Sequence, residues 1–123
     1  MIIALDIDGT IEEQPVFFCL LTHAFSAAGH EIVILSGRAP KSGSTEQALE
    51  GYKIKYDRVL YATTMEQKAS LCKEMGVDIL FDDEDEIITA VDEKTTVYKV
   101  RNDANFDFND RKWLSTDRLT RLL

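Results

Sequence analysis

Apolar residues fall into two kinds of segment along this chain. Short runs rich in Ile, Val and Leu alternate with longer segments in which apolar residues recur every three or four positions. Four of the short runs are apolar enough to be buried on both faces, as strands of a parallel sheet are. The five predicted strands are residues 2–6, 31–36, 58–62, 78–82 and 95–100.

The segments between these strands have the ends expected of helices. Pro15 begins one whose broad apolar surface runs to Gly29 and consists of Phe17, Phe18, Leu21, Ala24, Phe25 and Ala28. Residues 44–47 and 64–67 fit the capping-box pattern, with Gly51 and Gly76 as stops. Residues 84–91 and 113–123 predict two further helices. Strands that alternate with helices predict a three-layer α/β/α sandwich around a five-stranded, mainly parallel, Rossmann-like sheet, as one domain over residues 1–123.

Composition narrows the function without identifying it. The chain is 45% hydrophobic and 29% charged, as ordinary globular proteins are. Its formal net charge of −8 disfavours a general affinity for nucleic acid, so a phosphate-bearing ligand has to be held locally or through a cation. No apolar run approaches the roughly 18 residues of a membrane span, so we expect a cytoplasmic protein with no membrane partner. Cys19 and Cys72 are expected to be buried free thiols.

Polar residues gather where the predicted strands end. Because ligands of parallel α/β sheets bind outside the carboxyl ends of the strands, these residues are expected to face one crevice. Crowded carboxylates raise one another's pKa unless a cation joins them, and an all-oxygen acidic site suits Mg²⁺. The residues are Asp6 and Asp8 after the first strand, Ser36, Gly37 and Arg38 after the second, and Asp82 and Asp83 after the fourth.

Two lysines of the third helix are candidates for a positive partner. Lys68 falls within about 30° of the centre of the helix's apolar stripe, whereas Lys73 lies more than about 100° away. Lys68 is also in the first turns of the helix, the end nearest the carboxyl ends of the strands. We therefore predict that Lys68, and not Lys73, faces the acidic crevice.

These residues resemble the signature of the phosphatase branch of the haloacid dehalogenase superfamily. Four motifs match in order and spacing over about residues 1–100: residues 6–10 (DIDGT), residues 36–38 (SGR), Lys68, and the pair Asp82 and Asp83. A calcium loop begun at Asp6 is the other interpretation of the first motif, but its twelfth position is Phe17 instead of a bidentate Glu.

The resemblance implies an activity and a role for each motif residue. Asp6 is the expected nucleophile that forms an aspartyl-phosphate, and Asp8 the general acid and then base. The metal, Mg²⁺, is expected on Asp6, the backbone carbonyl of Asp8, Asp83 directly and Asp82 in support. Ser36, the Gly37 amide and Lys68 are expected to hold the phosphoryl oxygens, and Arg38 is a possible substrate contact.

Plainer interpretations of three residues stay open at this point. Ser36 also suits the cap of a turn, Arg38 a solvated surface charge, and Lys68 an ordinary ion pair. A phosphate- or metal-binding regulatory module without turnover is the alternative function.

The spacing of the motifs bears on the substrate. Only 28 positions separate Asp8 from Ser36 (36 − 8) and 32 separate Ser36 from Lys68 (68 − 36), so neither gap holds the cap domain that many relatives carry. Because no cap domain covers the site, we expect either a large substrate or a second subunit that closes the site. A homo-oligomer is therefore possible. A weaker similarity to polynucleotide 3′-phosphatases and deoxynucleotidase-like proteins leaves nucleotides, sugar phosphates and macromolecular phosphates as candidate substrates.

The segment after the last strand, residues 101–108, is rich in Asn and Asp. Two interpretations are open for it. It could line the crevice, but the simpler interpretation is a polar turn that leads to the helix predicted from Trp113.

Overall fold

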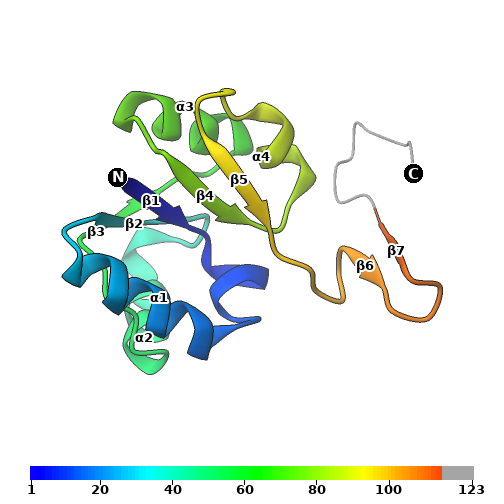
Figure 1. Cartoon of the computed structure of the whole chain (residues 1–123), viewed down its shortest axis with the longest axis horizontal. Helices are drawn as coiled ribbons and strands as arrows, with labels where there is room; N and C mark the ends of the chain where they lie inside the picture. The colour runs from blue at the N-terminus through cyan, green and yellow to red at the C-terminus, as the bar shows by residue number, and fades with distance from the viewer. Residues whose placement is uncertain (115–123) are drawn as a thin grey trace.

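The centre of the computed structural model, which describes residues 1–114, is a five-stranded parallel sheet in the order β3-β2-β1-β4-β5 (Figure 1). Every strand begins and ends within one residue of the predicted bounds. In the central register, Leu5 pairs with Ile34 on one side and with Phe81 on the other. The strands are β1 (Ile2–Leu5), β2 (Glu31–Ser36), β3 (Arg58–Tyr61), β4 (Ile79–Asp82) and β5 (Thr96–Lys99).

Helices cover both faces of the sheet (Figure 1). Helices α1 (Pro15–Ala27) and α2 (Ser44–Gly51) lie on one face, and α3 (Met65–Met75) and α4 (Asp85–Ala90) on the other. Side chains alternate between the layers along β1: Ile3 and Leu5 pack with Phe18 of α1, whereas Ala4 packs in the layer of Cys72 of α3. The predicted three-layer sandwich is confirmed, and within residues 1–114 each connection between sheet strands carries helices of the sandwich and no cap domain.

Two details of the helices differ from the predictions. The core contact of α1 is narrower than expected, because Phe17, Ala24 and Ala28 are exposed and Phe18 is the buried aromatic residue. Helix α3 has the predicted cap, with the Thr64 hydroxyl accepting a hydrogen bond from the Gln67 N–H at 3.1 Å. Helix α2 does not: Gly43, in the left-handed region at φ 72°, precedes it and Ser44 is already helical.

The chain after β5 passes through a polar turn at residues 103–105, as predicted, and then forms a hairpin where a helix was predicted. Strands β6 (Phe106–Asp107) and β7 (Lys112–Trp113) pair antiparallel, so the prediction of a helix beginning at Trp113 is wrong at its first residue. Asp107 accepts hydrogen bonds from the N–H groups of Asn109 and Asp110, which favours a turn over a helix. Residues 115–123, the remainder of that predicted helix, lie outside the described residues.

Strand order determines where a ligand would meet the sheet. The chain adds β2 and β3 on one side of β1 and then returns to add β4 and β5 on the other. The carboxyl ends of β1 and β4 therefore lie side by side at the point where the order reverses, which is the usual ligand position in such sheets. Over the described part of the chain, no helix combines the length and the apolar character needed to cross a membrane.

Candidate active site

The backbone after β1 brings the first motif close to the loop after β4. Asp6 is buried, and the irregular helical turn η1 (Ile7–Ile11) that follows it passes through Gly9 at φ 78°. A Cβ on Gly9 would collide with the Asp83 carboxylate and lie 2.9 Å from the Nδ2 atom of Asn102. Glycine is thus required here both by backbone conformation and by the close approach of two side chains.

Lys68 lies at the centre of the buried charges. Its Nζ donates to Asp6 Oδ1 at 2.9 Å and to Asp82 Oδ2 at 3.0 Å, and only 3% of the residue is exposed. Lys73, one helical turn and a half further on, is exposed. Asp6, Asp82 and Asp83 each offer an oxygen within 4.8 Å of the others, so two carboxylates contact the ammonium group and a third lies next to them.

This excess of negative charge changes the acidities of the cluster. Burial, and then the Asp82 carboxylate, raise the pKa of Asp6 well above its ordinary value, although Lys68 acts in the opposite direction. Burial likewise raises the pKa of Asp82 against the effect of Lys68. Burial disfavours the charged form of Lys68, but the Asp6 and Asp82 carboxylates outweigh it and raise the pKa of the lysine. The cluster therefore carries an excess of negative charge.

The oxygens of the two β4 acids are used differently. Asp82 Oδ1 accepts from the backbone N–H groups of Asp83 and Glu84 at 2.7 and 3.0 Å, and its Oδ2 accepts from Lys68. Asp83 Oδ2 accepts from Asn102 at 2.9 Å, but its Oδ1 is buried and has no hydrogen-bond partner among residues 1–114. A buried carboxylate oxygen without a donor, next to two further carboxylates, fits the hard oxygen ligands that Mg²⁺ takes.

Asp8 is not among the three clustered carboxylates. Its side chain is 59% exposed and pairs with Arg38, whose Nε and Nη2 atoms reach the two carboxylate oxygens at 3.1 and 2.6 Å. Arg38 is held in turn by the Ser44 carbonyl at 3.0 Å. The structure thus brings Asp6, Lys68, Asp82 and Asp83 together, and turns Asp8 toward Arg38 at the rim.

The second motif forms a compact turn at the end of β2. The Ser36 hydroxyl is buried, accepts from the Arg38 N–H at 3.0 Å and lies 3.3 Å from the Thr45 hydroxyl, which is the turn-capping arrangement. A Cβ on Gly37 would meet only the Ala62 carbonyl oxygen at an ordinary 3.7 Å, so its surroundings would admit a side chain. The phosphate-binding roles of Ser36 and Gly37 stay predictions.

Two asparagines after β5 join the site, and the sequence analysis assigned them no role. Asn102 and Asn105 are both buried, and both donate to Asp83, through its side chain and its backbone carbonyl respectively. Of the two interpretations of residues 101–108, the structure supports the one that the sequence analysis considered less simple, because residues 102–104 line the crevice. The sequence feature that could have revealed them is a pair of asparagines three residues apart, directly after a predicted strand.

An open hollow lies beside the three clustered carboxylates. It has a volume of about 370 Å³ and its rim is strongly acidic. Burial, and then Asp82 and Asp83, raise the pKa of Glu84 on this rim. The lining residues are Asp8, Gly9, Glu12, Glu13, Asp83, Glu84, Asn102, Asp103 and Ala104.

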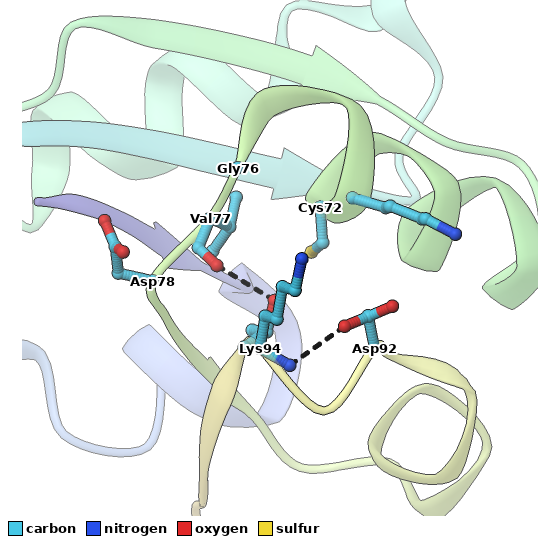
Figure 2. Close-up of a pocket in the computed structure, with 8 residues that line it drawn as sticks. Cys72, Gly76, Val77, Asp78, Asp92 and Lys94 are labelled. Carbon is cyan, nitrogen blue, oxygen red and sulfur yellow. Dashed lines mark hydrogen bonds between the residues drawn. The ribbon is translucent and has the colours of Figure 1, made fainter.

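A separate cavity of about 380 Å³ opens at the opposite, amino end of the sheet (Figure 2). It lies between the end of α3 and the loops before β4 and β5, with Cys72 on one wall and Lys94 on another. Burial raises the pKa of the Cys72 thiol to about 11, and both cysteines are free, with Cys19 only partly buried.

Comparison with known proteins bears on the fold. No family model and no curated protein matches the sequence. A chain from the structure of a Pnkp1/Rnl/Hen1 complex is similar over 80% of this chain and 45% of its own length, with 21% identity and a TM-score of 0.62. A universal stress protein solved in complex with cAMP matches 82% of this chain and 98% of its own, with 8% identity and a TM-score of 0.52. These likenesses establish an α/β fold.

Proposed function

We propose that this chain is a Mg²⁺-dependent phosphatase of the haloacid dehalogenase type, which hydrolyses a phosphate monoester. The observation that carries the proposal is the buried cluster of Asp6, Lys68, Asp82 and Asp83 at the reversal of strand order, in which one Asp83 oxygen has no donor among residues 1–114. The four motifs of that superfamily support it. The chain from the Pnkp1/Rnl/Hen1 complex has a similar fold, and this chain covers 45% of its length.

The reaction proceeds in two balanced steps. A carboxylate oxygen of Asp6 attacks the phosphorus, the bond to the leaving oxygen breaks, and Asp8 gives that oxygen a proton. Asp8 then takes a proton from the water that attacks the aspartyl-phosphate, which releases inorganic phosphate and restores Asp6. Because Asp8 pairs with Arg38 at the rim, the side chain has to turn toward the crevice for both transfers.

Negative charge in this site would be balanced partly by groups of the chain and partly by Mg²⁺. Asp6, Asp83 and the Asp8 backbone carbonyl would hold Mg²⁺, and Asp82 would keep Lys68 and the β4 turn in place. The chemistry that bound Mg²⁺ supplies is neutralisation of carboxylate and phosphoryl charge. Lys68, Ser36 and the Gly37 amide would hold the phosphoryl oxygens, and Arg38 would contact the substrate.

The acidic rim favours small substrates with one phosphate group. Its carboxylates, among them Glu12, Glu13 and Asp103, would repel the further phosphates of an oligonucleotide. We therefore expect a higher kcat/KM for a small monoester than for a 3′-phosphorylated oligonucleotide, with a gap that narrows as salt screens the rim.

Hydrolysis of p-nitrophenyl phosphate, with and without Mg²⁺, tests the proposal. Asp6→Asn should lower kcat on the order of 10³-fold or more, and Asp8→Asn by about 10²–10⁴-fold. Asp78→Asn at the far end of the sheet is the matched control and should retain wild-type turnover. Mg²⁺ binding without turnover of any ester in a panel of nucleotides, sugar phosphates and phosphorylated oligonucleotides would favour the regulatory module instead.

A further inference from the structure

The segment after β5 crosses back over the candidate site and ties its two acidic loops together. Asn102 is 4% exposed and lies at the point of contact. Its Nδ2 group donates one hydrogen bond to the Gly9 carbonyl and another to Asp83 Oδ2, each 2.9 Å long. One side-chain amide thus joins the loop after β1 to the loop after β4.

The surrounding hydrogen bonds fix the orientation of that amide. Its Oδ1 atom accepts from the N–H groups of Ala104 and Asn105 at 2.9 and 3.1 Å. If the amide were flipped, its NH2 group would face these two N–H donors, and both hydrogen bonds would be lost. The Asn102 N–H donates to Asn105 Oδ1 at 2.8 Å. Asn105 Nδ2 then donates to the carbonyls of Asp83 and Val100. Asn102 therefore presents both Nδ2 hydrogens toward the site.

This arrangement determines which oxygen of Asp83 is left to bind a metal. Asn102 holds Oδ2 and so restrains rotation of the carboxylate, and Oδ1 is the oxygen without a partner among residues 1–114. Gly9 adds to the constraint, because the space beside Oδ2 admits no Cβ. A ligand oxygen aimed by a buried hydrogen bond binds a metal more tightly than one that has to be ordered on binding.

We propose that Asn102 is a positioning residue that orients Asp83 for Mg²⁺. This inference rests on the metal site of the proposed function. It predicts that loss of the Asn102 amide weakens Mg²⁺ binding even when no substrate is present. An amide suits the task because it donates to a carboxylate without neutralising the negative charge that attracts the cation.

Calorimetric titration of the full chain with Mg²⁺, in the absence of substrate, tests the inference. We expect Asn102→Ala to raise the Kd for Mg²⁺ by about 10–100-fold. The matched control is Thr95→Val, which removes another buried hydrogen bond, 2.9 Å long, from the Thr95 hydroxyl to the Val77 carbonyl at the amino end of the sheet. The control should keep the wild-type Kd.

A second variant protects the test against misfolding. If circular dichroism finds Asn102→Ala unfolded, Asn102→Ser, whose shorter side chain cannot reach both acceptors, is judged by the same criterion. A Kd for the folded variant within about twofold of the wild type would overturn the role of Asn102 while the phosphatase proposal stands. A wild-type protein that binds no Mg²⁺ would instead overturn the metal site, and the role of Asn102 with it.

Discussion

The two ends of the central sheet use aspartate for opposite purposes. At the amino end, Asp57 and Asp78 are exposed, and each accepts a hydrogen bond from a strand N–H, those of Ile32 and Ile2 at 2.7 and 2.8 Å. At the carboxyl end, three aspartates are buried close together, and two of them share one lysine. The carboxylates at the amino end stabilise the starts of strands while remaining in water, whereas those at the carboxyl end are held together against their mutual repulsion.

The aspartates at the amino end of the sheet thus stabilise the fold, whereas those at the carboxyl end depend on contacts that the fold supplies. The cavity at the amino end carries the ordinary balance of charge, with Lys94 and Asp92 on one loop (Figure 2). The cluster at the carboxyl end is stable only because Lys68, backbone N–H groups and Asn102 compensate part of its charge. Buried ionisable groups whose pKa values are shifted in this way are typical of functional sites.

Removing the central cation should have the largest effect on stability. Lys68→Met leaves Asp6 and Asp82 buried without their shared partner, and we expect a loss of about 3–5 kcal/mol in the free energy of unfolding. Lys73→Met, on the exposed side of the same helix, should stay within about 0.5 kcal/mol of the wild type. Urea unfolding measures both, and equal losses would remove the distinction between the two lysines.

Filling the space beside Asp83 should have the next largest effect. Gly9→Ala combines a left-handed backbone with a collision at the Asp83 carboxylate, and we expect it to cost about 2–3 kcal/mol. Gly29→Ala is the matched control: it has a φ of 90° and nothing within 4 Å of the added Cβ. It should therefore cost only about 1 kcal/mol. Similar losses of stability for both variants, by urea unfolding, would show that space at Gly9 is not limiting.

The pH dependence of stability should differ between the wild type and Asp6→Asn. The pKa of Asp6 is raised on folding, so the metal-free folded state binds the proton more tightly than the unfolded state does. The stability due to Asp6 is therefore lost as pH rises from its ordinary value of 3.8 through the raised value. In chelator, the melting temperature of Asp6→Asn should rise relative to the wild type across this window. A constant difference would contradict the raised pKa.

The smallest of these effects is expected at the amino end. Asp78→Ala removes one hydrogen bond to the Ile2 N–H and should cost about 1 kcal/mol, without changing the Kd for Mg²⁺. Glu74→Gln, an exposed acid on α3, serves as the control and should be neutral within about 0.5 kcal/mol. A weaker Mg²⁺ affinity in Asp78→Ala, measured by calorimetry, would mean that the two ends of the sheet are coupled.

The sheet could be predicted because each strand has an apolar pattern that can be recognised locally, and polar residues mark where each strand ends. Lys68 was found in the same way, since helical spacing alone sets it on the inward side. What the sequence did not reveal depends on distant contacts. The rotation of Asp8 toward Arg38 arises from side chains 30 positions apart, and the contact from Asn102 to Gly9 spans 93. The hairpin of β6 and β7 was missed because the mixture of apolar and polar residues from Trp113 onward is also compatible with a helix.

The most direct test of the central claim is the melting temperature of Asp6→Asn in chelator and in Mg²⁺. If the cluster is held together against repulsion in order to bind a cation, the variant should melt about 2–6 °C above the wild type in chelator and gain nothing from Mg²⁺. The wild type should be stabilised by Mg²⁺. A variant that melts below the wild type in chelator, and that Mg²⁺ still stabilises, would contradict the account.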